Sequence, residues 1–158
     1  MHQPPPEALN MADWFLHERV REGRGDRVAL RIGDAVYTYA AVQAESFRWA
    51  HALRARGVLP EQRVLLALPD GLDFVGAFFG ALTLGAVVVM LNPELKPEAI
   101  AHQYGYTRAA LLVTDRAHAA AFDTAAAQSP FAPPRLVADD PAETGIRAGF
   151  AGPFPTHP

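Results

Sequence analysis

The chain has 158 residues, of which 50% are hydrophobic and 20% charged, which is enough for one compact domain with a packed core. Its 14 basic residues are scattered and outnumbered by 17 acidic ones, so the net charge of −3 excludes charge-driven nucleic-acid binding. Without cysteine the chain has no disulfide, thiolate metal ligand or thiol nucleophile. Its first residues lack the basic start and apolar core of a signal peptide, so we expect a cytoplasmic location.

The first third of the chain predicts a tail followed by helical and hairpin structure. Residues 1–9 are rich in proline and predict a flexible tail. Residues 10–57 predict a helix, a β-hairpin and a second helix. Asn10 is placed to cap the first helix, in which Trp14 and Phe15 should face inward.

The hairpin and the second helix follow directly. Strand-forming runs at 28–32 and 36–39 flank Gly33-Asp34, a two-residue turn, and Thr38 can then cap a helix that Gly57 ends. Four residues of that helix share one face, and Phe47 points away from them, which indicates a second contact surface. The four residues are Val42, Ser46, Trp49 and Leu53.

Residues 74–91 form an uncharged run of eighteen residues, long enough to be a single membrane-spanning helix. Its detail favours a buried helix, a turn at Gly85 and a buried strand. Gly76 and Gly80 would pair helices in a membrane, whereas in a soluble fold they let the helix lie close to its sheet. With the apolar strand at 63–68 before it, this segment predicts a βαβ unit.

The βαβ pattern continues to about residue 138, so residues 62–138 predict an α/β subdomain with a parallel sheet in a βαβαβ arrangement. Its later elements are a helix over 97–106, a strand over 110–114, a helix over 116–127 and a short strand over 135–138. Residues 139–158 are rich in Pro, Gly, Ala and acidic residues, which is typical of a linker.

Self-contained catalytic signatures are missing from the sequence. It has no glycine-rich phosphate loop, no nucleophile turn and no histidine pair at zinc spacing, so we assign no catalytic residue and no metal ligand. The six histidines are isolated and receive no role. Asp139-Asp140 predicts a solvated turn. Ligands of parallel sheets gather beyond the carboxyl ends of the strands, here at 69–71, 92–96 and 114–115, although these residues are also common turn formers.

An ordered series of short motifs resembles the N-terminal sequence of an adenylate-forming acyl- or aryl-CoA synthetase, and in particular that of benzoate-CoA ligase-like members. The resemblance covers about residues 10–140. The motifs are Thr38-Tyr39, Arg48, Ala52-Leu53, Gly57-Val58, Glu61-Gln62-Arg63-Val64, Leu68-Pro69-Asp70, Leu84-Gly85-Ala86, Leu91-Asn92-Pro93 and Leu95.

The resemblance implies the partial N-terminal region of the synthetase fold. The complete family enzyme uses ATP and Mg²⁺ to convert a carboxylic acid to an acyl-adenylate, and then transfers the acyl group to coenzyme A. The phosphate loop and the later family motifs are missing from this sequence, so we expect the isolated chain to be inactive and to bind none of these cofactors tightly. The resemblance places the loop at Asn92 near coenzyme A, where a basic residue directly after Asn-Pro suits the phosphate of coenzyme A. This chain has the acidic Glu94 at that position, so Lys96 is the candidate substitute.

The family layout also implies that residues 10–57 lack their partner sheet in this chain. We therefore expect either a second chain carrying the rest of the ligase or self-association. Two alternatives remain at the level of sequence: a non-catalytic α/β binding module, and a single-span membrane protein through residues 74–91.

Overall fold

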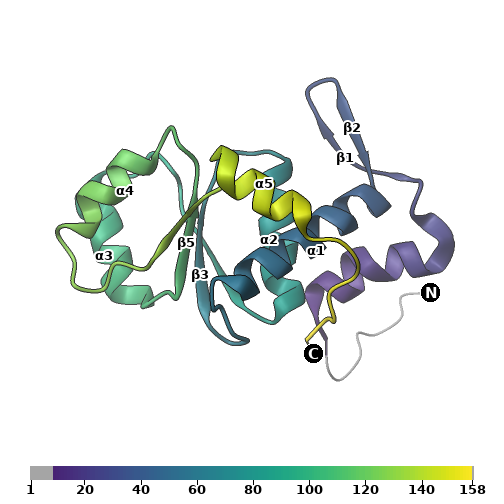
Figure 1. The fold of residues 1–158 in the computed structure, drawn as a ribbon, viewed down its shortest axis with the longest axis horizontal. Helices are drawn as coiled ribbons and strands as arrows, with labels where there is room; N and C mark the ends of the chain where they lie inside the picture. Colours follow the sequence, from purple (N-terminus) through teal and green to yellow (C-terminus); the bar gives the residue numbers. More distant parts are fainter. Residues whose placement is uncertain (1–8, 158) are drawn as a thin grey trace.

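A computed structural model describes residues 9–157 of the chain. Residues 1–8 of the predicted flexible tail lie outside the described residues, and Leu9 is exposed. The described residues form one parallel sheet with helices on both faces and a separate β-hairpin that projects away from it (Figure 1).

The parallel sheet has the strand order β4-β3-β5-β6. Its strands are β3 (Arg63–Ala67), β4 (Val87–Met90), β5 (Leu111–Thr114) and β6 (Arg135–Val137). The helices that connect them are α2 (Leu72–Leu84), α3 (Pro97–Thr107) and α4 (Ala119–Ala126). The predicted βαβαβ arrangement is confirmed. Gly85 ends α2 with a φ of 82°, so residues 74–91 form the predicted helix, turn and strand, and the single-span alternative is not supported. Among residues 9–157, no helix combines the length and the apolar character needed to cross a membrane.

Successive side chains of the central strands point to opposite faces of the sheet and belong to two separate hydrophobic cores. Leu66 and Val113 belong to the core under α1 (Tyr39–Ala55) and α2, whereas Leu65 and Leu112 belong to the core under α3 and α4. The molecule therefore has three layers, with α1 and α2 on one side of the sheet and α3 and α4 on the other (Figure 1).

Helix α1 lies directly against α2. A Cβ added at Gly80 would stand 2.6 Å from Cβ of Trp49, and one at Gly76 would stand 2.7 Å from the Trp49 ring. The prediction that these glycines bring α2 close to the sheet is wrong, because they bring it close to α1. The face formed by Val42, Ser46, Trp49 and Leu53 is buried as predicted, and α2 in this chain covers it.

The hairpin consists of β1 (Val28–Ile32) and β2 (Ala35–Thr38), joined by the predicted Gly33-Asp34 turn with a φ of 56° at Gly33. Thr38 caps α1, because its Oγ1 accepts a hydrogen bond of 3.2 Å from the Ala41 N–H. Both local predictions are confirmed.

The N-terminal helical segment contains two wide π-helical turns, η1 (Asp13–His17) and η2 (Val20–Arg24). Asn10 accepts hydrogen bonds from the N–H groups of Ala12 and Asp13, as a cap does. The inward orientation predicted for Phe15 is wrong: its side chain is 55% exposed, whereas Leu16 is buried, because the wider turns shift the residues that face α1.

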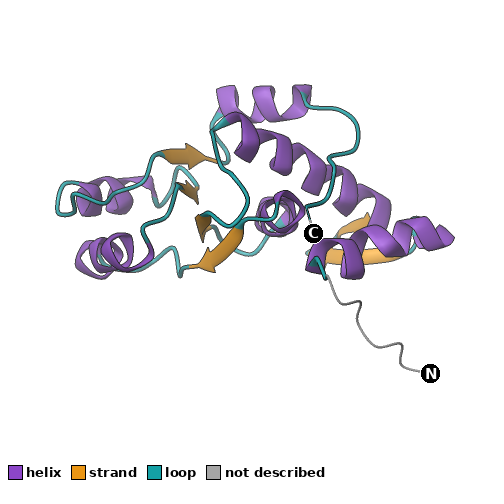
Figure 2. Ribbon diagram, turned by 90° about the horizontal axis from the view of Figure 1, so that it is seen from below, coloured by secondary structure: helices purple, strands orange, loops and turns teal. Residues whose placement is uncertain are grey.

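Part of the linker predicted over residues 139–158 is a helix. Asp140 caps helix α5 (Pro141–Gly149) by accepting a hydrogen bond from the Ala142 N–H at 2.9 Å. The helix packs on α1, and the following residues run back towards the N-terminal helical segment (Figures 1 and 2). The Pro, Gly, Ala and acidic content of residues 139–158 predicted a linker, and it did not reveal α5 because the residue that this helix buries is an arginine.

Candidate functional site

A hollow of about 290 Å³ lies at the carboxyl ends of β3, β5 and β6. Helix α2 leaves β3 on one side of the sheet, and α3 and α4 connect to β5 and β6 on the other. The hollow therefore occupies the topological switch point, where ligands of doubly wound sheets bind. Its lining is acidic at Asp70, Asp73, Asp115 and Asp139.

One of these carboxylates, Asp73, is paired with the arginine that anchors α5. Arg147 is 7% exposed and donates hydrogen bonds to Oδ1 of Asp73 at 2.7 Å and to the carbonyl of Ala138 at 3.0 Å. Its guanidinium also lies 3.5 Å from Glu45 and 4.2 Å from the Trp49 ring centre. Burial raises the pKa of Asp73, and the Arg147 charge partly opposes that rise.

Two other carboxylates stabilise turns. Oδ1 of Asp115 accepts hydrogen bonds from the backbone N–H of His118 at 2.9 Å and from Nδ1 of its ring at 2.6 Å. Oδ1 of Asp139 accepts a hydrogen bond of 2.8 Å from the Arg116 N–H. No group of three or more His, Asp or Glu side chains among residues 9–157 is arranged to hold a metal ion. Asp139 and Asp140 belong to ordered turn and cap structure.

The predicted coenzyme A loop lies beyond the carboxyl end of β4, at the same edge of the sheet as the hollow. Oδ1 of Asn92 accepts a hydrogen bond of 3.0 Å from the Glu94 N–H, and the Asn92 carbonyl accepts one from Leu95. Asn92 therefore shapes the loop. Lys96 is exposed and immediately precedes α3 at its N-cap position. Its ammonium group remains accessible to an anion.

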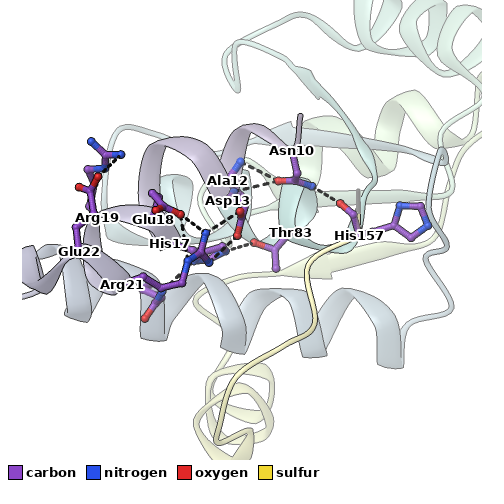
Figure 3. Close-up of polar contacts among 11 residues, drawn as sticks. Asn10, Ala12, Asp13, His17, Glu18, Arg19, Arg21, Glu22, Thr83 and His157 are labelled. Carbon is purple, nitrogen blue, oxygen red and sulfur yellow. Dashed lines mark hydrogen bonds and ion pairs between the residues drawn. The ribbon is translucent and has the colours of Figure 1, made fainter. Parts of the chain in front are cut away.

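His17, to which the sequence assigned no role, is buried between the N-terminal helical segment and α2. Its Nε2 lies 2.9 Å from Oγ1 of Thr83 (Figure 3). Its Nδ1 lies 3.2 Å from Nε2 of Gln43, and its ring stacks on Phe47 with 4.8 Å between the ring centres. Because Thr83 donates its own proton to the Phe79 carbonyl, it accepts from His17. Burial lowers the pKa of His17 to about 4, so the ring is neutral at pH 7.

Phe47 does form the predicted second contact surface. It is half-buried and lines a hollow of about 420 Å³ on the outer side of α1, opposite Phe150 and Pro153 of the C-terminal segment. Residues of this chain therefore cover part of the surface that the sequence left without a partner.

The geometry defines a doubly wound parallel α/β protein with a hollow at the carboxyl edge of its sheet. Residues 16–150 match the family described as AMP-binding enzyme. Because this match covers most of the chain, the chain belongs to the AMP-binding enzyme family.

Individual relatives agree with this assignment. The chain is 32% identical over 111 residues to a 3-hydroxybenzoate–CoA/4-hydroxybenzoate–CoA ligase of Thauera aromatica, covering 70% of this chain and 21% of that protein. It is similar to the crystal structure of a benzoate CoA ligase from Burkholderia xenovorans, with a TM-score of 0.77 and 25% identity over 94% of this chain and 30% of that chain.

The N-terminal domain of FACL13 from Mycobacterium tuberculosis is also similar, with a TM-score of 0.78 and 25% identity over 91% of this chain and 37% of that chain. The resemblance read from the sequence motifs is thereby confirmed: the chain corresponds to an N-terminal portion of an AMP-dependent CoA ligase. It spans between about a fifth and two fifths of the length of these relatives. Nothing in the comparisons supports the alternative of a non-catalytic binding module.

Proposed function

We propose that this chain supplies the N-terminal portion of an AMP-forming acid–CoA ligase that acts on aromatic carboxylic acids. The observation that carries the proposal is the family match through residues 16–150, together with the hydroxybenzoate–CoA ligase among its relatives. The reaction converts the acid with ATP to an acyl-adenylate and pyrophosphate, and then with coenzyme A to the thioester and AMP. The lack of cysteine supports a cytoplasmic location for this enzyme.

The residues of this chain do not by themselves fit ATP and Mg²⁺. The hollow at the switch point is lined by carboxylates, which repel phosphate, and two of them are engaged in turns. The described residues contain no metal-binding group of three carboxylates or histidines, and the sequence has no glycine-rich phosphate loop. We therefore assign the adenylation chemistry to residues that a second segment or chain supplies, and expect none from the isolated chain.

A fusion tests this assignment. This chain is joined to the remaining sequence of the Thauera ligase in place of the segment that it matches, and carboxylate-dependent exchange of pyrophosphate into ATP is measured with 3-hydroxybenzoate and 4-hydroxybenzoate. We expect exchange by the fusion and none by the isolated chain. Turnover by the pure 158-residue chain, or a folded but inactive fusion beside an active native ligase, contradicts the proposal.

The substrate class needs its own test, because the acyl pocket of the fusion comes from the relative. The DNA that follows codon 158 is read, and any complete ligase that it encodes is assayed with a panel of aromatic and aliphatic acids. We expect the frame to continue into a Ser/Thr/Gly-rich loop and the product to prefer aromatic acids. A preference for aliphatic acids refutes the aromatic assignment and leaves the reaction class standing.

The loop at Asn92 and Lys96 is proposed to lie beside the phosphates of coenzyme A, with Lys96 as the pairing cation. Support comes from its exposure at the carboxyl edge of the sheet. In the active fusion, Lys96→Ala should raise KM for coenzyme A and leave pyrophosphate exchange unchanged, since exchange does not involve coenzyme A. An unchanged KM for coenzyme A removes Lys96 from this role.

A further inference from the structure

The outer edge of the sheet at β4 is open in the described part of the chain. Strand β4 pairs with β3 alone among residues 9–157, and its four residues, Val87–Met90, are all apolar. Met90 is 59% exposed and Val87 is 42% exposed. Proteins usually protect such an edge with a charge, a proline or a bulge. Strand β4 has no charged residue or proline, and its register with β3 is continuous over four positions.

The backbone hydrogen bonds show which groups of β4 face outward. The N–H groups of Val87 and Leu91 donate to the carbonyls of Gln62 and Leu66, each at 2.9 Å. In a parallel pair, alternate residues of a strand bond to the same neighbour, so Val89 also faces β3. The N–H and C=O groups of Val88 and Met90 therefore point to the open edge.

The position of the C-terminal segment indicates the direction from which a further strand would enter. The His157 N–H donates to the Thr83 carbonyl at 2.9 Å, and the Asn10 side chain donates to the His157 carbonyl (Figure 3). Asn10 also donates to the carbonyl of Leu82. A Cβ added at Gly85 would lie 2.8 Å from His157. This contact lies two residues before β4 begins. A strand that starts after a short connection from His157 is therefore placed at the amino end of β4 and can run parallel to it.

We propose that the open edge of β4 is the docking surface for one parallel β-strand from the remaining part of the ligase, which bonds to the backbone groups of Val88 and Met90. This inference rests on the proposed function for the existence of that remaining part. The occupant fits the observations, because the matched relatives contain more than twice the length of this chain. A strand in this place extends the all-parallel sheet and covers Met90.

Amide hydrogen exchange, resolved by residue, tests the proposal on the 158-residue chain and on the fusion with the remainder of the Thauera ligase. In the isolated chain the Val88 and Met90 amides should exchange rapidly while Val89 is protected. In the fusion, Val88 and Met90 should become protected by at least about 100-fold. Rapid exchange at both residues in a catalytically active fusion overturns the inference and leaves the proposed function intact.

Two charge variants separate edge pairing from a general surface effect. Met90→Lys places a charge at the edge, and Ile146→Lys places one on α5 at a similar exposure of 55%. We expect Met90→Lys to lower the melting temperature of the fusion and not that of the isolated chain, and Ile146→Lys to change neither. Equal effects of the two variants contradict the proposal.

The remaining outcomes also decide the matter. If the isolated chain forms dimers in sedimentation velocity, and Val88 and Met90 become protected as its concentration rises, then the occupant is a second copy and the proposal is wrong. If the fusion does not fold, the remainder of the ligase is added as a separate chain and the same amides are measured. Failure to protect them in that mixture counts against the proposal.

Discussion

The two faces of the sheet are assembled in different ways. The α3–α4 face is built from consecutive elements, and its core is formed by apolar residues and Tyr104. The α1–α2 face gathers segments from both ends of the chain, and buried polar contacts at His17 and Arg147 join them. Segments that are distant in sequence need specific contacts to hold them in one arrangement. Comparable substitutions should therefore reduce the free energy of unfolding more on the α1–α2 face than on the α3–α4 face.

Acidification gives the largest expected difference between the faces. Burial lowers the pKa of His17 from 6.5 to about 4, so the unfolded chain binds a proton that the folded chain does not. Stability from the neutral ring is fully present above pH 6.5 and is lost as pH falls towards 4, by about 3 kcal/mol in total. Urea unfolding between pH 4 and 7.5 measures the loss. The variant His17→Gln should show a flatter pH dependence, and an identical profile would falsify the assignment.

Removal of the α5 anchor should come next in size. Arg147→Met leaves Asp73 and Glu45 without their shared cation, and we expect a loss of about 2–3 kcal/mol, below the range for a fully buried pair because the Asp73 side chain is 41% exposed. Arg135→Met is the control on the opposite face, where the Asp123 partner is 64% exposed, and should cost at most about 1 kcal/mol. Denaturant unfolding compares them, and equal losses contradict the contrast between the faces.

A matched pair of glycine substitutions tests close packing. Gly80→Ala places a Cβ 2.8 Å from the Ser46 carbonyl oxygen, and backbone cannot rotate away, so we expect a loss of about 1–3 kcal/mol. Gly105→Ala on α3 meets only Phe131, at 3.8 Å, and should gain up to about 1 kcal/mol from helix propensity. Thermal and urea unfolding of the two variants measure whether each one gains or loses stability. A neutral Gly80→Ala variant rules out the close contact between α1 and α2.

The smallest effect is expected at Phe47. Its side chain is half-buried at the rim of the outer hollow, so Phe47→Ser should cost about 1 kcal/mol, whereas Trp49→Ser should cost about 3–5 kcal/mol because Trp49 is fully buried. Sedimentation velocity of the two variants and the unchanged chain accompanies the unfolding measurements. Equal costs place Phe47 in the core, and a change in oligomer distribution for Phe47→Ser alone supports its role in association.

Local patterns were sufficient for most elements. Thr38 capped its helix, Gly33-Asp34 formed the hairpin turn, and Gly85 ended α2, because each depends on backbone preferences within a few residues. The same patterns failed at Phe15, where π-helical turns changed the facing residues, and over α5. Helix α5 buries Arg147 and leaves Ile146 exposed, so a pattern of hydrophobic residues could not reveal its anchor.

Of the candidate site, the sequence located the carboxyl-end loops, since the order of strands and turns fixes which residues follow each strand. The pairing of Asp73 with Arg147 could not be predicted, because 74 residues separate the two and neither position is unusual in its own segment. His17 was missed for the same reason. Its only local signal was a histidine beside an apolar residue, which is more often a surface feature.

The sequence by itself determined the α/β class, the boundaries of the βαβ unit and the family resemblance, because short-range periodicity, caps and ordered motifs carry that information. Only the tertiary structure decided that α1 rests on α2, that Arg147 and His17 are buried, and that β4 has an open edge within the described residues. Each of these depends on contacts or missing neighbours between segments far apart in the chain, where burial and hydrogen bonding, and not local preference, set the energy.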